Sequence, residues 1–263
     1  MPDKTLIFIP TYNERENAPR MCMEIYKLGL DADVLFVDDA SPDGTGTALD
    51  EMKPRFPRLI VHHRSGKLGI GSAHAYAIQW AYDQGYQILV TMDCDFTHLP
   101  EDIPKMIAAA EGYDVAVGSR FMTKGSLPGW SRIRKLTTAS GHFLTKTLLG
   151  IPFDASGAFR VYHLTTIPRE VFHLVAPTGY AFFFESLFVL SKNGFRIAEI
   201  PIVLPGRTSG SSKMSLRHIV SGVSRLLVVP ALAIIRPSRF KLRHPRTPQL
   251  TDQEQSTRDV LIN

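Results

Sequence analysis

The chain has 263 residues, of which 44% are hydrophobic and 21% are charged, and its formal net charge is +5. This composition is typical of a folded globular protein and excludes a wholly disordered chain. Its two cysteines lie in unrelated contexts, which excludes a disulfide-rich scaffold and disfavours a zinc site. The first residues, MPDKTLIFIP, lack the apolar stretch of a secretory signal, so we expect a cytoplasmic protein.

The first 120 residues alternate between short apolar runs and helical segments. We expect strands at 4–9, 33–37, 59–62, 87–92 and 115–117, and helices at 15–28, 45–52, 71–83 and 101–110. Strands that are apolar on both faces and separated by helices predict βαβ units. The expected fold class is therefore α/β, with a Rossmann-like, mostly parallel sheet flanked by helices.

The regular alternation ends near residue 120. We expect a basic loop at 121–135, helices at 136–149, 167–172 and 180–192, strands at 159–162 and 196–203, and a basic Gly- and Ser-rich loop at 205–213. The polar, basic residues 237–263 predict a disordered tail. The chain thus divides into a main domain at 1–215, a helix at 216–236 and the tail.

Residues 216–235 carry apolar side chains at helical spacing, with Arg217 and Arg225 on the opposite face. The uninterrupted apolar run is ten residues long and contains Pro230, whereas a membrane span needs about 20 residues. This pattern favours an amphipathic helix that lies on a membrane surface or on a partner. A helix packed against its own domain and a short membrane span are the alternatives.

Charge is unevenly distributed along the chain. Residues 1–114 contain 10 Lys and Arg against 18 Asp and Glu, whereas residues 115–263 contain 20 against 7. The sequence has no acidic residue between Asp114 and Asp154, or between Glu199 and Asp252. This pattern favours a polyanionic partner, which could be a phosphate, a lipid headgroup or a nucleic acid.

Polar residues gather where four of the expected strands end. The segments that follow these strands contain TYNE, DDASPDG, HRSGKLGIG and DCD. Because the carboxyl ends of parallel strands meet at one edge of a sheet, we expect these segments to surround one crevice. Helix capping and turns explain single residues here, but the adjacent carboxylates of Asp38 and Asp39 need a compensating cation or hydrogen-bond donor.

The sharpest chemical pattern is Asp93-Cys94-Asp95. Residues i and i+2 of an extended segment point to the same side, so both carboxylates can bind one cation. Carboxylate oxygens with open coordination positions suit Mg²⁺ or Mn²⁺ that bridges two phosphates.

Five sequence runs resemble the family 2 glycosyltransferases, and within that family they are most similar to the polyprenol-phosphate (dolichol-phosphate) mannosyltransferases. The runs are FIPTYNERENAPR, VDDASPDGTG, HRSGKLGIGSAHAYA, MDCDFTHLPEDI and VGSRF. The resemblance covers roughly residues 4–215 and implies a GT-A fold. It also implies a metal-assisted, inverting transfer of a hexose from a nucleotide sugar, above all mannose from GDP-mannose, to a polyprenyl phosphate.

The resemblance also implies roles for individual residues. Nucleotide-sugar binding is implied for Pro10, Tyr12, Glu14, Asp38, Asp39, Asp43, Lys67, Gly69, Gly71 and Asp93. Within this set, Glu14 would lie near the ribose, while Asp38 and Asp39 would accept hydrogen bonds from the base. Metal binding is implied for Asp93 and Asp95. The implied catalytic residues are Asp95 and four cations that would face phosphates, Arg120, Arg134, Arg207 and Lys213.

A phosphate acceptor is already an anionic nucleophile at neutral pH, because its second pKa is about 6, so a strong general base is not required. The implied partners are the nucleotide sugar, the polyprenyl phosphate lipid, and either a membrane surface or a small membrane-anchoring subunit at the cytoplasmic face. The alternatives are the same chemistry with UDP-glucose or another nucleotide sugar, and a non-catalytic nucleotide-sugar-binding subunit. A nucleic-acid partner is not expected, because it would leave the acidic crevice unexplained.

Overall fold

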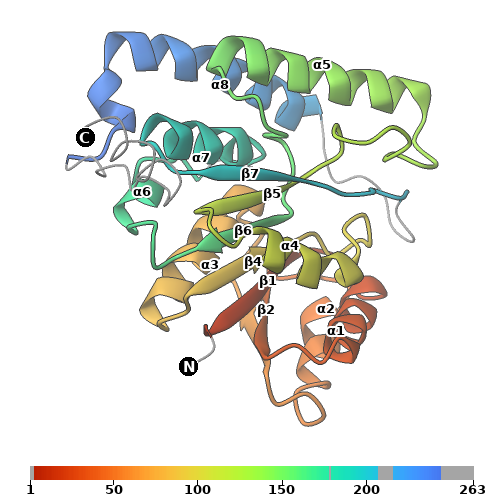
Figure 1. Ribbon diagram of the computed structural model, residues 1–263. Helices are drawn as coiled ribbons and strands as arrows, with labels where there is room; N and C mark the ends of the chain where they lie inside the picture. Colours follow the sequence, from red (N-terminus) through yellow and green to blue (C-terminus); the bar gives the residue numbers. More distant parts are fainter. Residues whose placement is uncertain (1–2, 178, 207–215, 244–263) are drawn as a thin grey trace, which may run out of the picture.

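The structure, a computed structural model, describes residues 3–177, 179–206 and 216–243. Within these residues, a seven-stranded sheet lies at the centre with helices on both faces (Figure 1). The strands are β1 (Thr5–Thr11), β2 (Ala32–Asp38), β3 (Leu59–His63), β4 (Ile88–Thr91), β5 (Val115–Ser119), β6 (Arg160–His163) and β7 (Ile197–Pro201). The α-helices are α1 (Asn17–Lys27), α2 (Thr45–Asp50), α3 (Ile70–Asp83), α4 (Ile103–Ala109), α5 (Arg132–Leu149), α6 (Glu170–His173), α7 (Ala181–Lys192) and α8 (Leu216–Ile235). Two short 3₁₀ helices are η1 (Pro100–Asp102) and η2 (Pro237–Phe240).

The strand order is β3-β2-β1-β4-β6-β5-β7. All neighbouring pairs are parallel except those of β6, which runs antiparallel to both β4 and β5. The chain winds outward from β1 to β2 and β3, then returns to place β4 on the other side of β1. The direction of winding therefore reverses between β1 and β4, which is where open α/β sheets bind their ligands.

Each face of the sheet covers its own hydrophobic core. In β1, Leu6 and Phe8 join the core under α3, α7 and α8, while Ile7 and Ile9 join the core under α1 and α4. All four side chains are fully buried. This alternation on a strand that is apolar on both faces is what a sheet covered on both sides requires, and it confirms the mostly parallel α/β fold expected from the sequence.

Two of the boundaries that differ from the sequence-based expectation concern the start of α5 and the segment after α8. Helix α5 begins at Arg132, inside the expected basic loop, because the Ser131 side chain accepts a hydrogen bond from the Arg134 N–H and caps the helix. The expected tail does not begin at residue 237, because η2 follows α8 directly. Phe240 of η2 is buried and packs edge-to-face on Phe188 of α7, with ring centroids 5.4 Å apart.

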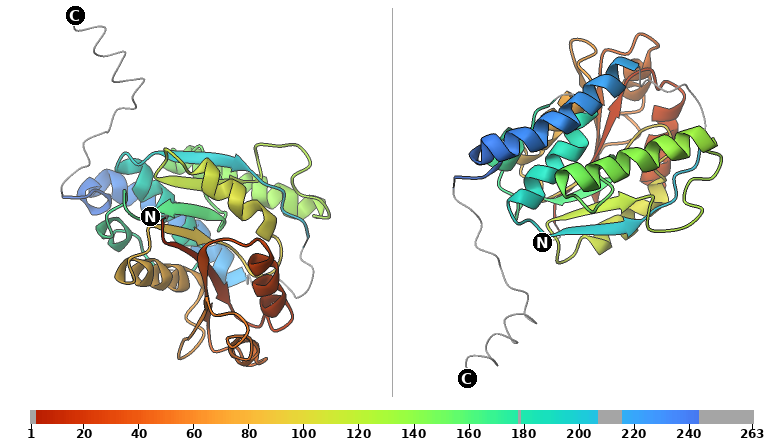
Figure 2. Two further views of the ribbon diagram at one scale, coloured as in Figure 1. Left: turned by 60° about the horizontal axis from the view of Figure 1, so that its bottom comes forward. Right: turned by 90° about the horizontal axis from the view of Figure 1, so that it is seen from above.

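Helix α8 lies beside α5 and packs on α7 (Figures 1 and 2). Arg225 of α8 binds Glu185 of α7 with two contacts, Nε to Oε2 at 2.9 Å and Nη2 to Oε1 at 2.7 Å. Glu185 is 0% exposed, and its Oε1 also accepts a hydrogen bond from the Ala176 N–H at 3.3 Å. One side of α8 is thus packed against its own domain, which was an alternative at the sequence level. None of the helices in the described part of the chain is both long and apolar enough to cross a membrane.

The outward sides of α5 and α8 carry exposed apolar side chains, and we call this surface the α5–α8 face. Its members are Ile133, Leu136, Phe143, Leu144 and Leu148 of α5 and Val220, Val223, Leu227, Val228, Ile234 and Ile235 of α8. Ile133 is 79% exposed and Ile234 is 83% exposed. Seen from above, the two helices form one side of the molecule (Figure 2, right). An exposed apolar surface of this extent marks an interaction site.

Candidate active site

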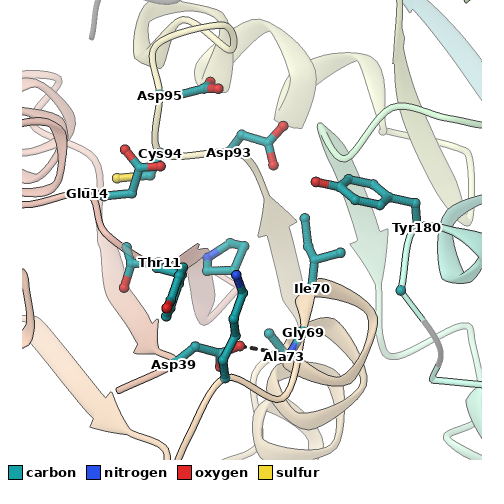
Figure 3. A pocket seen from close by; sticks show the side chains of 14 residues that line it. Thr11, Glu14, Asp39, Gly69, Ile70, Ala73, Asp93, Cys94, Asp95 and Tyr180 are labelled. Atoms are coloured by element: carbon teal, nitrogen blue, oxygen red, sulfur yellow. Dashed lines mark hydrogen bonds between the residues drawn. The ribbon is translucent and has the colours of Figure 1, made fainter. Parts of the chain in front are cut away.

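A pocket lies at the carboxyl ends of β1 and β4, where the winding of the sheet reverses (Figure 3). Its volume is about 180 Å³. Eight of the residues expected from the sequence line it: Pro10, Tyr12, Glu14, Asp39, Lys67, Gly69, Asp93 and Asp95. Six further lining residues were not singled out from the sequence: Thr11, Ile70, Ala73, Cys94, Gly179 and Tyr180. The four strand-end segments therefore meet at one crevice, joined there by the segment before α7.

Asp39 is held by the loop that precedes α3. Its Oδ2 accepts a hydrogen bond from the Gly69 N–H at 2.8 Å, and its Oδ1 binds the Arg64 guanidinium. Arg64 also donates to the Gly69 carbonyl at 3.1 Å and to the Ser72 hydroxyl at 2.8 Å. The side chains of Arg64 and Asp39 are 8% and 7% exposed. Arg64 is thus the cation that compensates a carboxylate of the Asp38-Asp39 pair, a role that was not expected from the sequence.

Asp38 and Asp43 are not among the residues that line the pocket, and their expected place in nucleotide binding stays a prediction. Asp38 is 2% exposed and accepts hydrogen bonds from the Thr11 hydroxyl at 3.0 Å and the Ser41 N–H at 2.9 Å. Asp43 accepts from the Arg15 N–H at 3.1 Å and the Thr45 N–H at 3.0 Å. Both carboxylates therefore tie the loops after β1 and β2 to each other.

The two glycines before and within α3 have different tasks. Gly69 has a φ of +92°, a backbone conformation that favours glycine, and it lines the pocket. Gly71 is not among the residues that line the pocket, and its expected contact with the nucleotide stays a prediction. A Cβ on Gly71 would lie 2.6 Å from the Gly179 carbonyl oxygen and 2.9 Å from the Gly179 nitrogen. Its small size permits α3 to pack on the pocket-lining segment before α7.

Among the residues that the structure describes, three other than glycine have positive φ, and each lies in a loop that surrounds the pocket. Asn13 (φ +55°) follows β1, Ala40 (φ +52°) follows β2, and Phe96 (φ +60°) follows β4. Residues with a side chain rarely adopt this backbone region, because it is strained for them. The strain persists only where the surrounding structure holds the backbone in place. The strained positions of the described chain therefore gather at this site.

A cation and an aromatic ring meet at one wall of the pocket. The Lys67 Nζ lies 4.0 Å from the centroid of the Tyr12 ring, and both residues line the pocket. Glu14, beside them, accepts a hydrogen bond from the Asn17 side-chain amide at 2.7 Å. This wall offers a stacking surface, a positive charge and a carboxylate to a ligand.

Asp93 and Asp95 stand in the turn after β4 (Figure 3). Asp95 is 7% exposed, and its Oδ1 accepts hydrogen bonds from the Thr97 N–H at 3.1 Å and the Thr97 hydroxyl at 2.6 Å. The Asp93 side chain is 34% exposed and points toward the Tyr180 side of the pocket. Thr97 thus fixes one carboxylate of the pair, while the other stands at the pocket surface.

His98 holds the backbone of this turn. Its Nδ1 accepts a hydrogen bond from the Asp93 N–H at 2.9 Å, and the ring is buried. Burial lowers the pKa of His98 to about 4, so the imidazole is neutral at pH 7. The turn is therefore held without a histidine cation that would neutralise the two carboxylates.

The donor set fits a divalent cation that completes its coordination from a ligand. No group of three or more His, Cys, Asp and Glu that could hold a metal occurs among the described residues. Two carboxylates suffice for Mg²⁺, which is usually bound through one or two carboxylates together with substrate phosphates and water. Asp93 and Asp95 meet this requirement at a pocket that is open to a ligand.

Two of the four cations expected to face phosphates have partners outside the pocket. The Arg120 Nε binds the Asp154 Oδ2 at 2.7 Å, and both side chains are largely buried. The Arg134 guanidinium lies 3.4 Å from the centroid of the Trp130 ring. Neither arginine is among the residues that line the pocket, and the expected contacts of both with phosphates stay predictions. Arg207 and Lys213 lie outside the described residues.

Comparison with known proteins places these features in a family context. The model of the family named "Glycosyl transferase family 2" matches residues 6–172. The chain is 35% identical to the polyprenol monophosphomannose synthase of Mycolicibacterium smegmatis, over 82% of this chain and 83% of that protein. It is also 35% identical to the undecaprenyl-phosphate mannosyltransferase of Micrococcus luteus, over 81% of this chain and 88% of that protein.

Solved structures resemble the fold at lower identity. The mannosyl-3-phosphoglycerate synthase of Rubrobacter xylanophilus superposes with a TM-score of 0.63 at 18% identity, over 95% of this chain and 79% of that one. The glucosyl-3-phosphoglycerate synthase of Mycobacterium tuberculosis, solved with Mn²⁺, UDP-glucose and phosphoglyceric acid, gives a TM-score of 0.60 at 17% identity, over 91% and 80% of the two chains. These likenesses bear on the fold, which is of the GT-A type.

Proposed function

The chain belongs to glycosyl transferase family 2 and is a glycosyltransferase, and from this premise we propose that it transfers mannose from GDP-mannose to a polyprenyl phosphate. The observation that carries this proposal is the 35% identity, over about four fifths of the chain, to two proteins named for mannosyl transfer to a polyprenyl phosphate. The product is a polyprenyl-phosphate mannose.

The donor would bind in the pocket between β1 and β4. Tyr12 offers a ring for stacking and Lys67 a charge for a phosphate. Asp39, fixed by Arg64 and the Gly69 N–H, would accept a hydrogen bond from a base N–H with a lone pair that its present partners leave. Glu14 would lie near the ribose. The position of Asp39 rests on the loop before α3, so that loop is part of the donor site.

Asp93 and Asp95 would hold a divalent cation, Mg²⁺ or Mn²⁺, together with the donor diphosphate. When bound, the cation would stabilise the negative charge that builds on the leaving diphosphate. Thr97 and His98 would keep the two carboxylates in place through the contacts described above. Asp95 is the more buried of the two, so its carboxylate would be the better-ordered ligand.

The acceptor phosphate would supply the nucleophile. A phosphate oxygen forms the new bond to the anomeric carbon as the bond to the nucleoside diphosphate breaks, with inversion at that carbon. The acceptor oxygen is already anionic at neutral pH, so no side chain has to remove a proton. Cations are needed instead to bring two anions together, and Arg207 and Lys213 remain our proposal for this task from the sequence.

The α5–α8 face would bring the enzyme to its lipid substrate. It combines exposed apolar side chains with basic residues at both helix ends, among them Arg132, Lys135 and Arg236, which are also exposed. A helix surface of this kind lies in the interface of an anionic bilayer. We place the protein at the cytoplasmic face of a membrane, docked directly or through a small membrane-anchoring subunit.

The test is transfer of radiolabelled mannose from GDP-mannose to undecaprenyl phosphate in detergent, with Mg²⁺, with Mn²⁺ and with EDTA. We expect label in the lipid phase only with a metal. Asp93→Asn should lower the rate at least about a hundredfold, as the loss of one electrostatic contact to the transition state does. The matched control is Asp83→Asn, at an exposed carboxylate that pairs with Arg169 away from the pocket.

Three outcomes would change the proposal. Transfer from UDP-glucose with GDP-mannose inactive would keep the chemistry and replace the donor. Transfer that EDTA does not affect would remove the metal from the scheme. Nucleotide-sugar binding without transfer from any donor would favour a non-catalytic nucleotide-sugar-binding subunit.

A further inference from the structure

A second cavity lies between the carboxyl-terminal ends of α5, α7 and α8, next to η2. Its volume is about 430 Å³. Its lining consists of Leu148, Leu149, Phe188, Lys192, Pro230, Ala233, Ile234, Pro237, Phe240 and Lys241. It shares no lining residue with the candidate active site, so the site described above does not explain it.

The walls of this cavity are apolar. Phe188 and Phe240, packed edge-to-face, are 2% and 1% exposed, and Leu149 is 5% exposed. Leu148 and Ile234 line the cavity and also belong to the exposed α5–α8 face. The cavity therefore opens at the surface that the proposed function places on a bilayer.

Its polar rim consists of two lysines. Among the described residues that line the cavity, Lys192 and Lys241 are the only charged ones and none is a carboxylate. The Asn193 side chain brings them to the same end of the cavity, because its Nδ2 donates to the Phe240 carbonyl at 2.7 Å and its Oδ1 accepts from the Leu242 N–H at 2.8 Å. Asn193 thus follows Lys192 directly and binds the backbone on both sides of Lys241. This rim is complementary to an anionic headgroup.

The size of the cavity indicates what it holds. An engineered apolar cavity of about 150 Å³ accommodates one benzene molecule. The present volume of about 430 Å³ is therefore enough for an apolar chain on the order of 15 carbons. A ligand with one such chain and an acidic group at its end would match both the apolar walls and the lysine rim.

We propose that this cavity binds one acyl chain of an anionic phospholipid, with the phosphate of its headgroup between Lys192 and Lys241. The inference takes the bilayer from the proposed function as the source of the lipid, but binding itself needs neither the transferase activity nor the donor site. The bound lipid would anchor η2 and the end of α8 that contains Pro230.

The first test measures binding of cis-parinaric acid, a fluorescent 18-carbon fatty acid, to the full chain without a bilayer. We expect saturable binding to one site. Ala233→Trp, which fills the cavity, should abolish it. Lys192→Glu combined with Lys241→Glu should weaken it at least tenfold without a change in the core. The matched control is Lys124→Glu, at an exposed lysine outside the cavity, which should leave the affinity unchanged.

The second test identifies the source of the chain by displacement and native mass spectrometry. Displacement by phosphatidylglycerol, with phosphatidylcholine ineffective, supports the proposal. Displacement by undecaprenyl phosphate alone would assign the cavity to the acceptor and overturn it. Stronger binding after removal of residues 244–263 would mean that this segment occupies the cavity, and it too would overturn the proposal. Parinaric acid binding that none of the cavity variants changes would do the same.

These results are separable from those on the transferase. If mannosyl transfer fails while the cavity variants alter lipid binding as expected, the proposed function is wrong and the lipid site stands. If transfer proceeds and lipid binding is absent, the reverse holds.

Discussion

Replacement of Arg225 by methionine should destabilise the protein, because it leaves the buried carboxylate of Glu185 without its cation. Glu185 is 0% exposed, and Arg225 supplies two of its contacts, at 2.9 and 2.7 Å. Removing one partner of a buried ion pair costs about 3–5 kcal/mol, because the remaining charge stays buried. The Ala176 N–H still donates to Glu185, so we expect the lower end, about 3 kcal/mol of the free energy of unfolding.

Replacement of the other partner, Glu185, should lower the free energy of unfolding by less, because the two partners differ in exposure. Arg225 is 21% exposed and can turn to water when Glu185→Gln removes its partner, so we expect about 1 kcal/mol. The double variant should be more stable than Arg225→Met alone, with a coupling of about 2 kcal/mol in the mutant cycle.

Urea denaturation of the two single variants, the double variant and Arg236→Met measures these values. Arg236 directly follows α8 and is exposed, so its replacement is a matched loss of charge next to the same helix. An Arg225→Met variant within about 0.5 kcal/mol of the parent protein would refute the reasoning, since it would mean that Glu185 finds another partner or that α8 is not docked.

Three further predictions concern the candidate site and its surroundings. Gly71→Ala should lower the free energy of unfolding by about 1–3 kcal/mol in urea denaturation, because the added Cβ would lie 2.6 Å from a backbone atom, and it should also raise the donor KM. The control is Gly66→Ala, whose added Cβ meets open space. Equal effects of the two substitutions would contradict the steric argument. Burial lowers the pKa of His74 to about 3 in the folded protein. In the unfolded chain this histidine binds a proton near the ordinary pKa of histidine, whereas in the folded protein it does not. The free energy of unfolding therefore falls as the pH drops. Between pH 7.5 and 5.5 this loss should be about 1.4 kcal/mol larger for the parent than for His74→Phe, and identical pH profiles would disprove it. Arg64→Leu should raise the donor KM at least about tenfold. The substitution leaves the buried carboxylate of Asp39 without its cation and removes a hydrogen bond that holds the loop before α3. An unchanged KM would exclude Asp39 from donor binding.

The sheet and the location of the pocket could be predicted from the sequence, because both depend on short-range patterns. Apolar strands alternating with helices specify a parallel sheet, and the polar strand ends specify its ligand-binding edge. The choice between Asp38 and Asp39 could not be predicted, because successive side chains of a strand face opposite sides and a shift of one residue exchanges them. Thr11 and Ser41 donate hydrogen bonds to the Asp38 carboxylate, and Arg64 holds Asp39 at the pocket through an ion pair.

Long-range pairing explains the other differences. Arg120 is bound by Asp154, and nothing in the sequence between them indicates that the two meet. The same holds for Gly71 and Gly179, which meet only after α3 and α7 are packed. The exposed apolar side of α5 was also not predicted, because an apolar stripe on a helix ordinarily indicates the side that faces the core.

The position of β6 in the sheet has a consequence for the order in which the protein is made. β4 ends at Thr91, and its outer neighbour begins at Arg160, roughly 70 residues later in the chain. At the usual rate of synthesis, that interval lasts about 4 to 14 s. During it, the nascent chain presents an apolar strand with an unpaired edge, which is a template for aggregation. β5 is already present but cannot close the gap, because β6 separates it from β4. Pairing of this edge of β4 is therefore a late event at the ribosome.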